Sequence, residues 1–375
     1  MKQLVVIFTL WLAWMPVGAQ KTLTLEECLK LGIENNLSLE GNRNEMRKAK
    51  HLLSENRAKL WPQISAVAGF NDNFNPPVSV TDGSAYGNLY NVTKTLQYNA
   101  SAGLQLQMPL YNQTVYTAVD IARTMNELNR LSYEKAREDL MMQISKMYYL
   151  GQNTMEQLTL IQENMVRLRE LRDITLAFFD NGMAMEVDVK RVNINLENQQ
   201  VQYDNAKSML VQQLNLLKYV MDYPAEEEIT LTPVDTERMQ SASLTGLRSD
   251  LYELQLLQSQ EKLAKQQKDL IRQGYLPSLT LTGSWMYSAY TDKARHWFHS
   301  GPSNHWYPST GLGITLRVPI FDGFDKRARI RKAQIDQENA KLNYENTLKN
   351  MQTQYLNATN ELMNNQRNFK KQKDY

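Results

Sequence analysis

The sequence has 375 residues, with 42 Lys+Arg against 40 Asp+Glu, one Cys and four His. A net charge of +2 gives no electrostatic case for nucleic acid, and a single cysteine excludes a disulfide framework or a CxxC-type zinc site. A mean hydropathy of −0.53 excludes a bundle of membrane-spanning helices. Gly and Pro together supply only 27 residues. Turns are therefore scarce and the secondary-structure elements should be long.

Residues 1–19 have the layout of a secretory signal peptide. Lys2 precedes an apolar run over residues 4–14, and small residues follow at positions 17–19. The run is shorter than the roughly 20 apolar residues that a spanning helix needs. We therefore expect the mature chain to start at Gln20 and to leave the cytoplasm. An uncleaved membrane anchor is the alternative.

Two helices and two strands are predicted next. Residues 25–35 and 39–60 are helical in pattern, and Pro62 ends the second helix because proline disfavours helix in the residue before it. Apolar and polar residues alternate over 63–70 and again, over eleven residues, near 99–110. A period of two predicts strands with one apolar and one polar face. The stretch between them, residues 71–97, is rich in turn-forming residues.

Residues 114–179 predict one very long helix. They contain no proline, and from Leu140 to Phe179 the apolar positions follow a heptad spacing. Such a helix would be about 100 Å long at 1.5 Å per residue. Asp180, Asn181 and Gly182 form a turn, and a second helix with 3,4 spacing follows to about residue 222. These segments predict a long antiparallel coiled-coil hairpin.

The second half of the chain repeats the first. After a polar linker over 225–245, a helix is expected over 247–274, strands near 279–287 and 312–320, and a long helix from Asp325 onward. Short sequence words recur at offsets of 215 and 210 residues, one of them containing Pro62 and then Pro277. Internal repetition indicates a tandem architecture. We divide the chain into a leader (1–19), a first repeat (20–245) and a second repeat (246–375).

The strands have the length and the alternation of outer-membrane barrel strands. A soluble sandwich with its apolar faces packed together is the alternative, but aromatic residues near the second loop (positions 285–307) resemble an interfacial girdle. An open sheet in lipid leaves backbone groups unpaired, so the sheet must close by oligomerisation, and three copies would give twelve strands around an aqueous lumen. The expected lipid-facing residues are Leu104, Leu106, Leu281, Ile314 and Leu316, and the expected lumen-facing residues are Gln105, Gln107, Thr280, Thr282 and Thr315.

The chain resembles the TolC-like outer membrane factor family. The likeness is carried by the opening LTLEECL through NNL, by the words MPLY (108–111) and VPIFDG (318–323), and by FDNGM through EVDV (179–189). The resemblance implies a mainly α-helical chain with membrane β-structure, closing as a trimeric 12-stranded barrel on an α-helical tunnel. It implies an exit duct in the outer membrane of a Gram-negative bacterium, serving efflux or type I secretion. The implied partners are two further copies of the chain, a periplasmic adaptor, an inner-membrane transporter and outer-membrane lipid. A periplasmic adaptor or a structural coiled coil without a pore is the alternative function.

The coiled-coil tip is the candidate gate. Its residues are Asp180, Asn181, Gly182 and Asp188. The family resemblance implies that Asp188 holds the tip closed, whereas a carboxylate at this position would also serve to cap the helix. By the repeat offset, a second tip is expected near position 392, beyond Tyr375. We therefore expect that roughly 55–60 residues, including this tip and its return helix, would lie beyond a truncated end.

We expect no enzyme, no cofactor and no metal. The sequence contains no nucleophile elbow, HExxH, P-loop or GxGxxG motif. Asp292 and the three histidines at 296, 299 and 305 could bind a metal, but they fall in a predicted outer loop without a scaffold to fix them. A basic cluster at residues 326–332 could bind phosphate groups, of lipid or of nucleic acid, or form a solvated helix face. Its position just after a strand favours a membrane boundary.

Overall fold

The computed structural model describes residues 21–82, 89–233, 251–291 and 306–373. The expected signal peptide, the boundary between the two repeats and the loop with its three histidines lie outside these residues. The chain forms two compact units. The first takes in the described residues of 1–46, 129–255 and 349–375, and the second takes in those of 47–128 and 256–348.

The first unit is built around a small parallel strand pair and the helices beside it. Strand β1 (Lys21–Leu23) pairs with β6 (Ile229–Leu231), and helices α2 (Leu25–Asn35) and α5 (Glu186–Met221) belong to the same unit. Strand β6 lies in the stretch that we interpreted as a linker, and that interpretation was wrong there. Three residues are too few to show a period of two. The buried core comprises Leu23, Cys28, Leu39, Leu140, Ile144, Tyr148, Leu217, Val220, Met221, Ile229 and Leu231.

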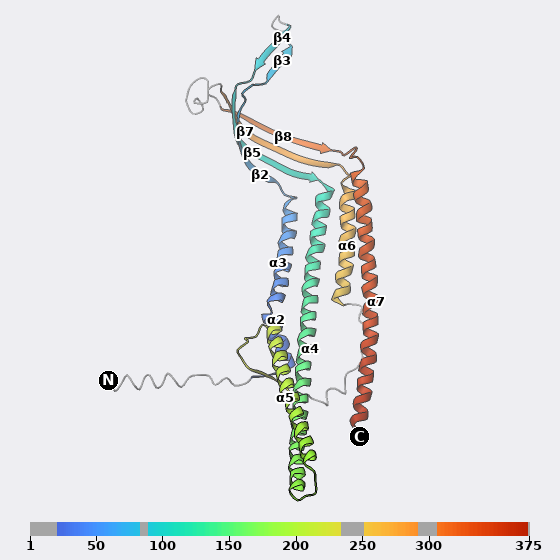
Figure 1. Ribbon diagram of the computed structural model, residues 1–375. Helices are drawn as coiled ribbons and strands as arrows, with labels where there is room; N and C mark the ends of the chain where they lie inside the picture. The colour runs from blue at the N-terminus through green and yellow to red at the C-terminus, as the bar shows by residue number, and fades with distance from the viewer. Residues whose placement is uncertain (1–20, 83–88, 234–250, 292–305, 374–375) are drawn as a thin grey trace, which may run out of the picture. The chain divides into compact units, whose positions relative to one another are not determined.

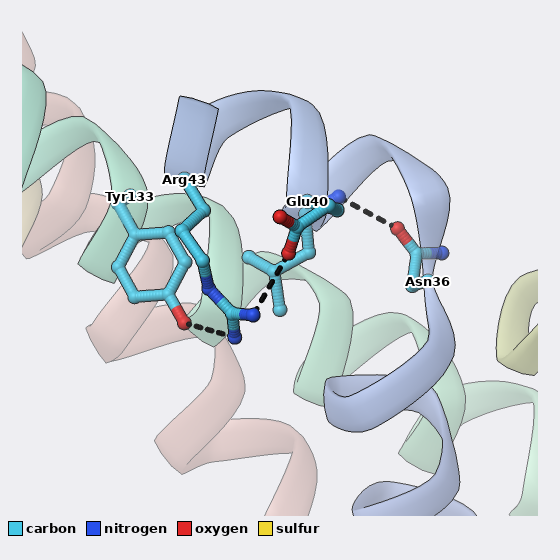
Figure 2. Close-up of polar contacts among 5 residues, drawn as sticks. Asn36, Glu40, Arg43 and Tyr133 are labelled. Carbon is cyan, nitrogen blue, oxygen red and sulfur yellow. Dashed lines mark hydrogen bonds and ion pairs between the residues drawn. The ribbon is translucent and has the colours of Figure 1, made fainter. Parts of the chain in front are cut away.

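The junction between α2 and α3 (Leu37–Ala58) is fixed by Asn36. Its side-chain oxygen accepts a hydrogen bond from the backbone N–H of Leu39 at 2.9 Å, and its amide nitrogen donates to the carbonyl oxygen of Val220 at 2.8 Å. Figure 2 shows the next turn of α3, where Arg43 donates to Glu40 at 2.8 Å and to the Tyr133 hydroxyl at 3.4 Å. One capping residue thus starts α3 and ties it to α5.

The long helix and its return helix form as predicted. Helix α4 runs over Gln113–Asp180 as a single helix of 68 residues, and α5 follows the turn with 36 residues. The heptad seam is the buried side of α4, with Ile144 and Met165 almost fully buried. Gln162 on α4 donates to the Tyr203 hydroxyl on α5 at 3.0 Å. This hydrogen bond joins the two helices of the hairpin.

The second unit contains a single four-stranded antiparallel sheet (Figure 1). Its strands are β2 (Gln63–Asp72), β5 (Tyr98–Tyr111), β7 (Ser278–Thr291) and β8 (Trp306–Arg317), in the order β2-β5-β7-β8. The predicted strand at 312–320 ends three residues early, at Arg317, before Pro319. The stretch predicted to contain only turns also holds a hairpin of β3 (Val78–Asp82) and β4 (Tyr90–Lys94), so that prediction was incomplete.

Helices leave the sheet at one end of its strands (Figure 1). Helix α6 (Tyr252–Gln273) precedes β7, and α7 (Asp325–Lys373) follows β8. The two pack antiparallel, with Lys268 donating to Gln337 at 2.6 Å and Gln258 donating to Tyr344 at 3.2 Å. None of the helices in the described part of the chain combines the length and the apolar character needed to cross a bilayer.

Candidate functional site

The strand register gathers the predicted apolar residues on one face of the sheet. Leu104 pairs with Trp285, Leu281 pairs with Ile314, and Leu279 pairs with Leu316. Directly opposed residues in an antiparallel pair have their side chains on the same face. Alternation along each strand then adds Leu106, so all five residues expected to face lipid share one face.

This apolar face is largely open to its surroundings. Ile314 and Leu316 are 64% and 63% exposed, and Leu104 is 40% exposed. A soluble sandwich would need a second strand layer over this face, yet the four strands that could supply two layers form one sheet. The chain therefore presents a continuous apolar surface of the kind that marks contact with a partner or a membrane.

The opposite face is polar. Gln105 pairs with Ser65 and Ser284, Gln107 pairs with Thr282, and Thr280 pairs with Thr315. All five residues expected to face a lumen thus share this second face. Their neutral polar side chains can form hydrogen bonds with water without adding charge to this face.

Aromatic side chains gather toward both ends of the strands. On the loop side, Tyr287 is in edge contact with the mid-strand Trp285 at 5.6 Å between ring centroids, and nearer the loops Phe70 stacks on Tyr98 at 6.1 Å. Toward the helix end, aromatic residues flank the strand termini, among them Trp61, Tyr111, Tyr275 and Phe321. Two aromatic bands that bracket an apolar strand face are typical of membrane β-structure.

The helical tip is closed by a Schellman turn at Gly182, whose φ is +72°. The Gly182 N–H donates to the Phe179 carbonyl at 2.9 Å, and the Met183 N–H donates to the Phe178 carbonyl at 2.8 Å. Asn181 donates to the Ala177 carbonyl at 2.7 Å. Glycine adopts the left-handed conformation without a steric cost, which explains its place in this turn.

Asp188 caps the helix that follows the tip. Its carboxylate accepts a hydrogen bond from the Met185 N–H at 3.2 Å and lies 3.6 Å from the Arg191 guanidinium. Both partners are local. The structure thus shows the capping role that the sequence left open, whereas Asp180 ends α4 two residues before Gly182. The contact with Met185 could have been expected, because a carboxylate at the third helical position often accepts a hydrogen bond from the N–H of the residue that precedes the helix.

Comparisons with known proteins bear on this geometry. The family model described as "Outer membrane efflux protein" matches residues 29–221 and 237–374. The chain belongs to the outer membrane efflux protein family. It is 23% identical over 297 residues to the outer membrane protein TolC of Vibrio cholerae, covering 75% of this chain and 61% of TolC. It is also 23% identical over 333 residues to the outer membrane protein OprJ of Pseudomonas aeruginosa, covering 86% and 66% of the two chains.

The fold agrees with that of a solved family structure. The outer membrane protein VceC from Vibrio cholerae superposes with a TM-score of 0.66 at 15% identity, over 86% of this chain and 75% of VceC. The chain spans less than two thirds of the length of TolC and of OprJ. Family membership and these relatives locate the protein in the outer membrane of a Gram-negative bacterium.

Proposed function

We propose that this chain is the outer-membrane exit duct of a tripartite efflux pump or of a type I secretion system. The observation that carries this proposal is the register of the four-stranded sheet, which gives one exposed apolar face and one neutral polar face. Strand β7 has 14 residues. At about 3.3 Å per residue and a tilt near 40°, such a strand covers roughly 35 Å, which is enough to cross a hydrocarbon core.

The proposed assembly is a homotrimer. The sheet order leaves β2 and β8 as edges, each with a row of backbone groups that has no strand partner in the described chain. Such edges are not tolerated in lipid. Pairing of β8 in one copy with β2 in the next would close a 12-stranded barrel. The face with Gln105, Gln107 and Thr282 would line its lumen, and the face with Leu104 and Ile314 would contact outer-membrane lipid.

The proposed repeat is supported by the element bounds. Helix α3 runs over 37–58 and α6 over 252–273, so both ends are displaced by the same 215 residues, as are the starts of β2 and β7. We therefore keep 20–245 and 246–375 as the two structural repeats, after a leader over 1–19. In this scheme, the hairpin of α4 and α5 belongs to the first repeat.

The proposed duct does no chemistry and takes its energy from partners. Those partners are an inner-membrane transporter and a periplasmic adaptor, which would bind the helical part. The reading of this chain as the adaptor itself is not supported, because the matched family is that of the outer-membrane component. Many apolar residues of the hairpin remain exposed in one chain, including Leu160, Ile174 and Val201 at 54–58%. They provide surface for neighbouring copies or for an adaptor.

A mass and conductance measurement tests the proposal. The mature protein, purified in detergent, is weighed by native mass spectrometry and then added to planar bilayers. We expect a mass of three chains and discrete conductance steps, with heat-denatured protein as the control. A monomer that stays soluble without detergent and gives no conductance would contradict the duct.

A further inference from the structure

A pocket of about 490 Å³ lies where β8 passes into α7, entirely within the second unit. Aromatic and aliphatic side chains, among them Tyr275, Ile320 and Phe321, form part of its wall, and Arg327 and Arg331 form another part. Phe324 has a φ of +66°, which is unusual for a bulky residue, and its ring contacts that of Phe321 at 5.5 Å between centroids. This part of the pocket wall therefore contains a strained backbone conformation.

The charge in the pocket is positive and is not neutralised locally. The Lys326 ammonium group already has partners, because it donates to Asp322 at 3.0 Å and lies 5.1 Å over the Tyr275 ring. The hydrogen bond from Lys326 lowers the pKa of the Asp322 carboxyl, so that carboxylate stays ionised and paired. Arg327 and Arg331, one helical turn apart, have no ion-pair partner among the described residues.

Helix stability does not explain these arginines. Cations in the first turns of a helix oppose its macrodipole, and both residues lie in the first two turns of α7. Two guanidinium groups with free hydrogen-bond donors match the geometry of a phosphate group, which they can bind in a bidentate manner. The pocket thus has the chemistry for an anion that carries phosphate.

Apolar surface leads from the strand to this pocket. The alternation of β8 continues beyond its last residue, with Leu316, Val318 and Ile320 exposed by 63%, 51% and 93%. A ligand that extends along this path must therefore be apolar at one end and anionic at the other. A soluble phosphate compound would leave the apolar path open to water, whereas a phospholipid would cover it.

The corresponding junction of the first repeat has a related pocket. It measures about 420 Å³ and is lined in part by Trp61, Tyr116, Arg57 and Arg123, where α3 enters β2 and β5 leads to α4. Aromatic and basic residues thus recur at the same end of the sheet, as at a membrane–water interface. There, however, Arg123 is paired with Asp120 at 2.8 Å. Arg57 has no ion-pair partner among the described residues, so this pocket has one unpaired arginine where the pocket beside α7 has two.

We propose that the pocket beside α7 binds the headgroup of an anionic phospholipid, with the phosphate between Arg327 and Arg331 and the acyl chains along Leu316, Val318 and Ile320. The inference rests on the proposed placement of the sheet in the outer membrane. The bound lipid belongs to the leaflet that faces the helices, because the pocket lies at the helix end of the strands. It would fix the depth of the barrel in that leaflet.

Native mass spectrometry of the full chain in non-ionic detergent tests the site, with phosphatidylglycerol as the probe. The test variant is Arg327→Gln/Arg331→Gln. The matched control is Arg329→Gln/Lys332→Gln, which removes the same charge from the same helix at residues that do not line the pocket. A third variant, Arg327→Lys/Arg331→Lys, keeps the charge and removes the bidentate donors.

We expect wild type and control to retain phosphatidylglycerol, and the Gln/Gln test variant to bind it on the order of tenfold more weakly. The Lys/Lys variant should fall between them, and excess inorganic phosphate should not displace the lipid. Equal loss in test and control variants, full retention in the test variant, or displacement by phosphate alone would overturn the site. Conductance is measured on the same samples. A wild type that binds lipid but does not conduct would refute the duct and leave the site intact.

Discussion

Gly103 of β5 lies directly against the backbone of Trp285 in β7, so that a Cβ on Gly103 would be 2.2 Å from the Trp285 carbonyl oxygen. The same Cβ would be 2.7 Å from the Met286 Cα. Backbone atoms cannot turn aside as a flexible side chain does. The central strand pair of the sheet joins the two halves of the chain. A glycine at position 103 therefore allows the backbones of β5 and β7 to approach closely.

Gly103→Ala should loosen the pairing of β5 with β7. We expect a loss of about 1–3 kcal/mol, the usual cost of overpacking, and a lower melting temperature for the detergent-solubilised protein by circular dichroism. Gly69→Ala is the matched control, since a Cβ there would meet only the Ser101 Oγ at 3.6 Å. Equal melting temperatures for the two variants would show that β5 and β7 can move apart without cost.

Leu104→Arg should impair membrane assembly, and Gln105→Arg should be tolerated. The two residues are neighbours on β5 but lie on opposite faces of the sheet. An arginine facing lipid near the midplane costs about 2–4 kcal/mol, whereas a lumenal arginine stays hydrated. The measurement is the amount of each variant in outer-membrane fractions, with Ile314→Arg as a second test of the apolar face. The reverse order for Leu104 and Gln105 would mean that the faces are assigned the wrong way round.

Asp188 is proposed to bias the tip toward the closed state in addition to capping α5. Asp188→Ala removes both the charge and the hydrogen bond to Met185, whereas Asp188→Asn keeps an acceptor for that N–H. An exposed ion pair between Asp188 and a cation on a neighbouring coil would be worth about 0–1 kcal/mol, and the proposed trimer would contain three such pairs. If the charge holds the gate, both variants should raise single-channel conductance in planar bilayers.

A purely local role for Asp188 predicts a different pattern. Loss of a cap costs about 0.5–2 kcal/mol of helix stability. In that case Asp188→Ala alone would lower the melting temperature, and neither variant would change conductance. That result would place the gate elsewhere.

Cys28 should be inert toward thiol reagents in the folded protein. It is fully buried in the core of the first unit, and burial raises the pKa of its thiol to about 11. Reagents attack the thiolate, so labelling by iodoacetamide at neutral pH should be slow and should become fast in denaturant. Rapid labelling of the native protein would show that this core opens readily.

The same burial predicts the direction in which the stability of the protein changes with pH. The folded pKa of Cys28 is higher than that of an unfolded cysteine, near 8.5. Its contribution to stability is therefore complete below about pH 8.5 and is lost as pH rises toward 11. Chemical unfolding of wild type and Cys28→Ala between these pH values measures the difference. A wild type that loses no more stability than the variant would contradict it.

The sequence by itself determined the elements whose pattern extends over many residues. The heptad seam from Leu140 to Phe179 and the alternation around Leu104 indicated their structures because burial repeats with the period of the helix or strand. The recurrence of Trp61-Pro62 as Leu276-Pro277 likewise indicated the repeat. Short elements carry no period. Strand β6 with Ile229 was therefore missed, although it completes the core of the first unit.

Only the tertiary structure decided which residues meet. Alternation assigns Leu104 and Ile314 each to a face of its own strand, but strand order and register place both on the same face of one sheet. The pocket beside α7 joins Tyr275 to Arg327, residues more than fifty positions apart that are brought together by the return of the chain through β7 and β8. Local sequence pattern reports how a side chain lies relative to its own backbone. Long-range pairing, stabilised by backbone hydrogen bonds between strands, determines its neighbours.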